Sequence, residues 1–234
     1  MKYVLPVVAA VAIASVHALA GLPQGVQADR PEEDAKKSQD NLKKIVLAMF
    51  TYHKAHGHFP DSAIRDEKGS PLLSWRVALL PHLNEAELYR SFKLDEPWDS
   101  AHNKALLRKM PAVYRLPGAK PSRDAVTFYR VFIGKGTAFE GREGLRINDI
   151  RDGLGNTLMV VEATEAVAWT KQDELVYAAD QPIPKVGGLF RDGFLAAYCD
   201  GSVRLIRNDY DETRMRLAIV RDDGYGLPAE DGQP

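Results

Sequence analysis

The chain has 234 residues, with 31 Lys and Arg against 32 Asp and Glu, and a single cysteine, Cys199. This balance leaves no basic excess to neutralise phosphates, so the composition argues against nucleic-acid binding. One cysteine cannot form an internal disulfide, and an ordinary hydrophobic core must therefore stabilise the fold. The length is sufficient for such a core.

The first 28 residues have the pattern of a secretory signal peptide. Lys2 precedes an alanine-rich apolar run to about Val16, which is shorter than a transmembrane helix requires. Small residues follow, before the charged residues that begin at Asp29. We expect cleavage after Ala28, with Ala20 as the second choice and an uncleaved N-terminal anchor as the alternative. The sequence thus predicts an exported protein, periplasmic or extracellular, with no integral membrane segment after cleavage.

Removal of residues 1–28 leaves 206 of the 234 residues, which we assign to one domain, 29–224, and a flexible tail, 225–234. Lys2 is the only Lys, Arg, Asp or Glu that is lost, so the 31 basic residues become 30 against 32 acidic ones. The formal charge of the remaining chain is −2, which again gives nucleic acid no electrostatic attraction.

The stretch from Asp29 to His56 predicts a long amphipathic helix. Its apolar residues recur at three- and four-residue spacing, and acidic residues near its start complement the helix dipole. Asp29 is expected as the cap and Pro31 in the first turn. Gly57 ends the helix, and Pro60 prevents its continuation.

Three histidines, His53, His56 and His58, lie at the end of this helix. Two histidines on one helical face and a third ligand can hold zinc, with Asp61 as a further ligand. However, the zinc motif HExxH is missing, and histidines near a helix C-terminus also interact favourably with its dipole. We favour a structural role, in which His53 packs or forms hydrogen bonds and the other two histidines face water.

Short helices are expected after this segment, and strands from residue 125 onward. The expected helices are 84–92, 101–110 and 211–220. The expected strands are 125–134, 157–164 and 193–206. The last is a hairpin around Asp200-Gly201, a pair suited to a type I′ turn. Helices followed by strands favour an α+β fold, in which the long N-terminal helix packs on an antiparallel sheet.

Catalytic motifs are not evident. The sequence contains no G-x-S-x-G elbow and no glycine-rich loop with P-loop spacing. Cys199 has no histidine beside it in the sequence and is expected to be a small buried thiol. We therefore expect a protein without enzymatic activity.

A tryptophan between carboxylates, in Asp95-Glu96-Pro97-Trp98-Asp99, is a candidate ligand site. The ring can stack on a sugar while the acids bind its hydroxyls. Trp75 and Trp169 can be interpreted in the same way, and Arg76 as the buried partner of one of the acids. The candidate binding residues are Trp75, Arg76, Asp95, Glu96, Trp98, Asp99 and Trp169. We favour the alternative, in which the tryptophan fills the core and Asp99 or Ser100 caps the next helix.

A calcium site is a second candidate. Asp149, Asp152 and Asn156 lie close together around a glycine turn, and calcium prefers flexible oxygen ligands. The spacing is not that of an EF-hand loop, and Asp-Gly followed by Asn-Thr makes a good turn without a metal. We favour the turn, so no cofactor is expected and calcium is kept as a possibility.

Short motifs also follow one another along the chain in a recognisable order. In the first half they are Asn41-Leu42-Lys43, Tyr52-His53, Gly57, Phe59-Pro60, Ser74-Trp75-Arg76, Leu80-Pro81, Asp95 to Asp99, Asn103 and Met110-Pro111. Downstream they are Asp152-Gly153, Asn156-Thr157, Glu162, Trp169-Thr170-Lys171 and Asp200-Gly201-Ser202. As a set, over roughly Asn41 to Gly224, they resemble the family called domain of unknown function 1559. This family is also labelled SBP_bac_10, a bacterial solute-binding-like family.

This resemblance implies a fold but no established activity. Many members have a type IV prepilin-like start and resemble pseudopilins, in which a long N-terminal helix packs on an antiparallel sheet. Here a signal peptide pattern replaces that start, so assembly into a fibre through the helix is not expected. Of the three histidines, only His53 belongs to the family pattern.

Together these observations predict an exported, non-enzymatic structural or interaction protein with a pseudopilin-like domain. Its partner would be a protein of the cell envelope or a glycan. The alternative is an extracytoplasmic module that binds a solute or glycan through the Trp98 segment.

Overall fold

The structure is a computed structural model that describes residues 29–119, 125–141 and 143–225. The expected signal peptide, 1–28, and nearly all of the expected tail lie outside the described residues. Within the described part of the chain, no helix combines the length and the apolar character needed to cross a membrane.

The long N-terminal helix is confirmed as α1 (Glu32–His56). Its first turn carries three acidic residues, and Gly57 ends it at a φ of 83° in the left-handed region, where glycine is strain-free. The start differs from the expectation. Pro31 occupies the N-cap position without a side-chain cap, whereas Asp29 forms an ion pair with Arg191 at 3.2 Å.

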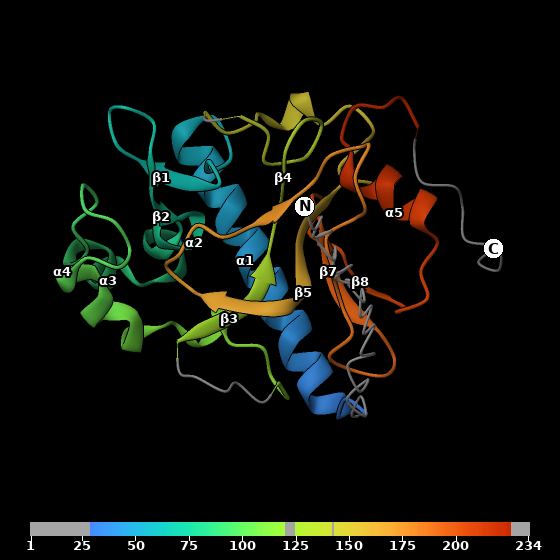
Figure 1. Cartoon of the computed structure of the whole chain (residues 1–234), viewed down its shortest axis with the longest axis horizontal. Coiled ribbons are helices and arrows are strands. Elements are labelled where there is room, and N and C mark those ends of the chain that lie inside the picture. The colour runs from blue at the N-terminus through green and yellow to red at the C-terminus, as the bar shows by residue number, and fades with distance from the viewer. Residues whose placement is uncertain (1–28, 120–124, 142, 226–234) are drawn as a thin grey trace, which may run out of the picture.

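A four-stranded antiparallel sheet forms the centre of the molecule (Figure 1). Its strands are β3 (Val126–Arg130), β5 (Leu158–Ala168), β7 (Phe194–Tyr198) and β8 (Val203–Ile206), in the spatial order β3-β5-β7-β8. Each neighbouring pair is antiparallel. Strand regions expected at 125–134, 157–164 and 193–206 thus supply all four strands of the sheet.

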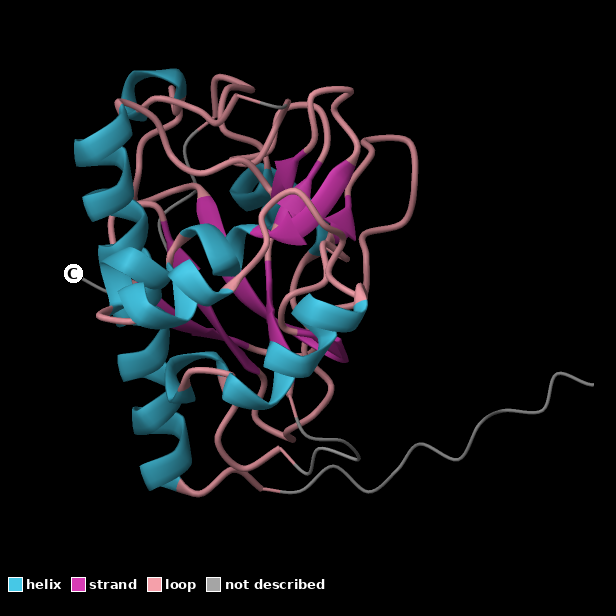
Figure 2. Cartoon of the chain, turned by 90° about the vertical axis from the view of Figure 1, so that its left-hand side faces the viewer, coloured by secondary structure: helices cyan, strands magenta, loops and turns pink. Residues whose placement is uncertain are grey.

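Both faces of this sheet are covered, because successive side chains of a strand point to opposite faces. Leu195 and Ala197 of β7 belong to the larger core, which contains the apolar side of α1, whereas Phe194 and Ala196 belong to a second core with α5 (Glu212–Ile219). Figure 2 shows α1 running along one side of the molecule beside the sheet. The expected α+β class, with a long helix on an antiparallel sheet, is therefore confirmed.

The connecting region between α1 and β3 contains short elements. They are β1 (Ala63–Arg65), β2 (Pro71–Ser74), α2 (Trp75–Ala78), η1 (Leu80–Leu83), α3 (Ala86–Ser91), α4 (Ala101–Ala105), η2 (Leu106–Lys109) and η3 (Ala112–Tyr114), where η marks a 3₁₀ helix. The remaining elements are β4 (Phe132–Ile133), η4 (Ile147–Asp149) and β6 (Leu175–Val176). The antiparallel hairpin of β1 and β2 was not expected from the sequence.

Two local expectations were wrong. Asn84 does not cap the helix that follows it, because its φ of 62° places it at the end of η1, and α3 begins later. The turn between β7 and β8 is not of type I′, which requires a positive φ at both central residues. Only Gly201 has one, at 87°, and the Asp200 carboxylate holds the turn by accepting from the Ser202 N–H at 2.8 Å.

Candidate functional site

Two of the three candidate tryptophans are core residues. Trp75 and Trp169 are fully buried, and their indole N–H groups donate to Glu174 Oε1 at 3.1 Å and to the Leu107 carbonyl at 2.9 Å. Both rings also pack against the buried ring of Tyr114. In this structure they therefore present no face to a ligand, as expected of tryptophans that fill the core.

Arg76 does not pair with any acid of the Trp98 segment, and that expectation was wrong. Its guanidinium forms a buried ion pair with Glu174, with Nη1 and Oε1 2.8 Å apart, and also donates to the Tyr129 carbonyl. Burial raises the pKa of Glu174, an effect that the Arg76 charge opposes. The pair lies 98 residues apart in the sequence, so spacing alone could not identify it.

The Trp98 segment forms a loop whose shape is set by a buried amide. The Asn103 side-chain N–H₂ donates to the carbonyls of Lys93, Glu96 and Pro97, at 2.9 to 3.2 Å. Trp98 itself is half-buried, and Lys171 Nζ lies 6.0 Å from the centre of its ring. Asp95 and Asp99 are exposed, and Ser100, not Asp99, caps α4. Sugar binding by this loop stays a prediction.

The candidate calcium ligands form hydrogen bonds that close turns. The Asp149 carboxylate accepts from the Arg146 N–H at 2.8 Å, and the Asp152 carboxylate accepts from the N–H groups of residues 223 and 224, both at 2.9 Å. Asn156 donates to the Asp152 carbonyl at 2.7 Å. Across the described residues, no three His, Cys, Asp or Glu side chains are placed to hold a metal ion together. Calcium binding stays untested.

The buried thiol expected at Cys199 is confirmed. Burial raises its pKa, and the nearby Asp200 charge acts in the same direction. Because a thiol reacts as the thiolate, this environment makes Cys199 a poor nucleophile.

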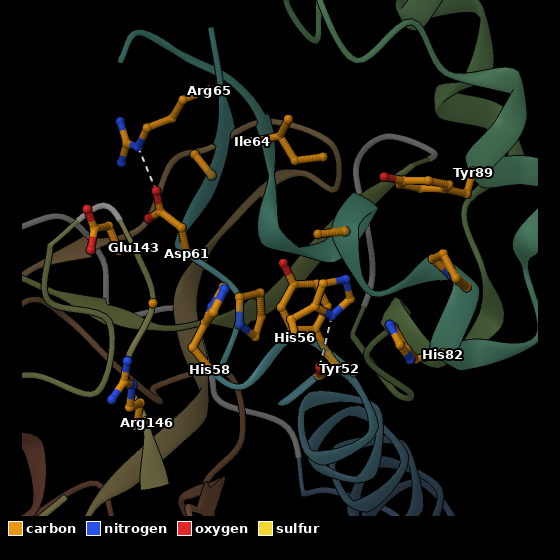
Figure 3. A pocket seen from close by; sticks show the side chains of 15 residues that line it. Tyr52, His56, His58, Asp61, Ile64, Arg65, His82, Tyr89, Glu143 and Arg146 are labelled. Carbon is orange, nitrogen blue, oxygen red and sulfur yellow. Dashed lines mark hydrogen bonds and ion pairs between the residues drawn. The ribbon is translucent and has the colours of Figure 1, made fainter. Parts of the chain in front are cut away.

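A hollow of about 920 Å³ opens at the C-terminal end of α1 (Figure 3). Its lining comes from four segments of the chain: 52–61, 63–65, 78–89 and 143–146. Among the lining residues are His56, His58 and His82, and we call the recess the histidine hollow. The described lining contains no serine, threonine, cysteine or lysine.

Backbone contacts fix the wall of the histidine hollow. The Phe59 N–H donates to the Leu145 carbonyl at 2.8 Å, which joins the loop after α1 to the segment 143–146. Gly144 has a φ of 69°, and a Cβ there would lie 1.9 Å from the Phe59 carbonyl oxygen. Only glycine permits this approach. His53 Nε2 accepts from the Ile147 N–H at 3.3 Å, which confirms the hydrogen-bonding role expected for this histidine.

The backbone also sets the tautomers of two histidines. His56 Nδ1 lies 2.9 Å from the Tyr52 carbonyl oxygen, and His58 Nδ1 lies 2.7 Å from the Phe59 carbonyl oxygen. A carbonyl only accepts, so Nδ1 of each ring carries the proton. In the neutral rings Nε2 is therefore a free acceptor. His56 is exposed as expected, whereas His58 is half-buried.

Aromatic side chains form the floor of the hollow. The His56 ring stacks on the Tyr52 ring with centroids 4.0 Å apart and an interplanar angle of 20°, and His82 meets Tyr52 edge-on at 5.5 Å. Tyr89 lies on the other side, with its ring pointing across the hollow (Figure 3). Burial raises the pKa of both tyrosines. Among the described residues neither hydroxyl has a hydrogen-bond partner, so both can serve a ligand.

Charges of both signs line the rim. Asp61 and Arg65 form an ion pair of 2.7 Å, and Glu143 and Arg146 lie on the same side of the hollow in Figure 3, across from Tyr89 and His82. Burial, and secondarily the charge of His56, lowers the pKa of His82, so its ring is neutral near pH 7. The hollow therefore combines donors, acceptors and an aromatic surface without a large excess of either charge.

Sequence patterns identified only one part of this site. His56, His58 and Asp61 were considered together because they are neighbours in the chain. His82 and Tyr89 come from η1 and α3, and no local spacing connects them to the end of α1. Their approach depends on the packing of η1 against α1, which is a tertiary contact.

Comparison with protein families gives one match, to SBP_bac_10, described as a protein of unknown function (DUF1559), over residues 35–134. The resemblance expected from the sequence is thereby confirmed. We call residues 35–134, which match this family model, the SBP_bac_10 region. Comparisons with the curated proteins and with the solved structures gave no match.

The SBP_bac_10 region contains three of the four segments that line the histidine hollow. The fourth, 143–146, follows the matched range, as do β5, β7 and β8 of the sheet. The resemblance expected downstream as far as Gly224 is outside this match and stays a prediction. The description of SBP_bac_10 assigns no activity.

Proposed function

We propose that this protein is an exported, non-enzymatic interaction protein that binds its ligand or partner in the histidine hollow. The observation that carries this proposal is the hollow itself, a recess of about 920 Å³. Backbone carbonyls hold Nδ1 of His56 and of His58, and Nε2 of each ring is left as an acceptor for a ligand. Ligand sites in proteins are commonly recesses of roughly 300–1,000 Å³ with a few placed polar groups. The size and the lining both fit that description.

The chemistry of the lining supports binding without catalysis. Covalent catalysis by serine, threonine, cysteine or lysine needs that side chain beside a base, and none of the four lines the described hollow. The described lining offers two tyrosine hydroxyls whose pKa is raised by burial, which disfavours their ionised form. The buried carboxylates Glu162 and Glu174, outside the hollow, are both held in ion pairs with arginines.

A pseudopilin-like, envelope-associated role is part of the proposal. The packing of α1 on an antiparallel sheet supports it, and the signal-peptide pattern of residues 1–28 supports export to the periplasm or beyond. The expected partners are an envelope protein or a glycan. The half-buried Trp98 loop is a second candidate for glycan binding, favoured by the accessible part of its ring.

Nuclear magnetic resonance of the histidine rings tests the site. The full protein would be titrated with a mixture of small amino acids, dipeptides, carboxylic acids and sugars. We expect binding compounds to shift the ring signals of His56, His58 and His82 and to leave His102, on α4, unchanged. Shifts confined to residues elsewhere, or no shift with any compound, would contradict a binding role for the hollow.

Export is tested by the mature N-terminus. We expect the protein isolated from its producing cell to lie outside the cytoplasm and its mass to show a chain that begins at Asp29. A start at Gly21 would favour the second cleavage position. An intact chain in the cytoplasm would contradict export.

A further inference from the structure

We infer that the ligand of the histidine hollow is a neutral carbohydrate. This inference rests on the proposed function and specifies the ligand class of the same site. Three independent features of the lining support it: the mixture of donors and acceptors, the balance of charge and the exposed ring stack.

The hydrogen-bonding groups of the hollow suit hydroxyls. The free Nε2 atoms of His56 and His58 accept, whereas the hydroxyls of Tyr52 and Tyr89 can donate. A sugar hydroxyl donates one hydrogen bond and accepts others, so it can use both kinds of group. A carboxylate or phosphate could use only the donors, and an ammonium group only the acceptors.

The charges of the hollow favour a neutral ligand. Asp61, Glu143, Arg65 and Arg146 lie on one side of the hollow, and the Asp61 carboxylate is already paired with Arg65. A pocket built to attract an ion presents one sign of charge, because the summed field then concentrates that ion. With two acids and two arginines, neither an anion nor a cation gains such attraction here.

A ring platform lies between these polar groups. The exposed imidazole of His56 rests on Tyr52 at 4.0 Å, and its outer face is open to the hollow. Sugar rings present C–H groups on one face, which pack against flat aromatic surfaces while their hydroxyls point outward. The Nδ1 bond of His56 to the Tyr52 carbonyl holds this platform in place.

A peptide fits the lining less well. Peptide recognition generally uses an apolar groove, a sheet edge or a charged cluster for specific side chains. The apolar lining consists of small or cyclic residues and one larger side chain, namely Pro60, Ala63, Ile64, Ala78 and Pro81. These provide no deep apolar pocket for a peptide side chain.

The test is a calorimetric titration of the full protein with neutral di- and trisaccharides of glucose, mannose, galactose and N-acetylglucosamine, and with di- and tripeptides as the comparison. At least one saccharide is expected to bind. Tyr89→Phe removes only one hydroxyl and should weaken that binding about tenfold, the loss expected of one buried hydrogen bond. His56→Ala removes the platform and should weaken it further.

Matched controls separate the hollow from the rest of the surface. Tyr225→Phe and His102→Ala change an exposed tyrosine and an exposed histidine away from the hollow, and both should bind as the wild type does. Unchanged thermal unfolding of each variant shows that its fold is retained.

The outcomes distinguish the inference from the proposed function. Peptides that bind in the hollow when no saccharide does would overturn the carbohydrate inference and leave the proposed function standing. Saccharide binding that is lost in Trp98→Ala but retained in His56→Ala would overturn it in favour of the Trp98 loop. Failure of every saccharide to bind would overturn the carbohydrate inference, and the proposed function is overturned only when the histidine ring signals also fail to shift with every compound.

Discussion

His53 and His56 are three residues apart on α1, yet the fold uses them differently. His53 Nε2 accepts from the Ile147 N–H and is therefore required in its neutral form, whereas His56 leaves its Nε2 free in the hollow. Burial, with a smaller effect from the charge of His58, lowers the pKa of His53. The sequence identified His53 as structural because it lies on the apolar side of the helix. It could not identify the hydrogen-bond partner, which comes from residue 147.

This shift in pKa predicts how stability depends on pH. A histidine whose folded-state pKa is depressed contributes stability that is fully present above its unfolded pKa of about 6.5. The contribution is lost as the pH falls through the lower, folded-state pKa. We expect the free energy of unfolding, measured by urea denaturation, to fall between pH 7.5 and 5.5, and His53→Gln to reduce this fall.

His102→Gln is the matched control, because His102 is an exposed histidine that bonds the Ser91 carbonyl through Nε2. It should leave more of the pH dependence in place than His53→Gln does. His82, whose pKa is also lowered, keeps part of the dependence in both variants. If the free energy of unfolding falls equally steeply with decreasing pH in the wild type and in His53→Gln, His53 does not cause the pH dependence.

At the scale of elements, α1 is joined to the sheet by a buried carboxylate as well as by apolar packing. Glu162 of β5 accepts from both Nη atoms of Arg30, from Ser38 Oγ and from the Leu195 N–H. The side chains of Arg30 and Glu162 are 5% and 2% exposed, so water contributes little to their solvation. The guanidinium also lies 4.4 Å from the centre of the Phe190 ring.

Glu162→Gln therefore should destabilise the protein by about 3–5 kcal/mol, because it leaves the Arg30 charge buried without a counterion. Glu33→Gln provides the control, since Glu33 pairs with Lys37 on the exposed face of the same helix. A surface substitution of this kind should leave the free energy of unfolding nearly unchanged. Denaturant unfolding of both variants checks the difference, and similar values for the two would refute the anchoring role of Glu162.

The elements that could be predicted are those whose signal is local and repeated. Apolar spacing and the Gly57 stop identify α1, branched residues identify β5, and Asp211 caps α5 by accepting from the Arg214 N–H. The hairpin of β1 and β2 escaped prediction because its strands have only three and four residues. The cap expected at Asn84 was wrong because asparagine is favourable in two places, at a helix cap and in the left-handed conformation that it adopts here.

The candidate sites show the same limit at the scale of the whole molecule. Arg76 was recognised as a buried arginine, but its partner Glu174 lies beyond the sheet strand β5 and was not considered. The core role favoured for the tryptophans holds for Trp75 and Trp169, which are buried. The aromatic rings that line the hollow belong to Tyr52 and Tyr89, which the sequence did not single out as ligand-binding residues. Packing of η1 against α1, and of α3 against η1, creates that recess, and no sequence spacing encodes it.

A crystal structure of the full protein with the tightest-binding neutral saccharide would show which site holds the sugar. We expect a sugar ring on the outer face of His56, with hydroxyls that donate to Nε2 of His56 or His58 and accept from the Tyr89 hydroxyl. Density for the sugar on the Trp98 loop, or at any site that does not touch the histidine hollow, would contradict it.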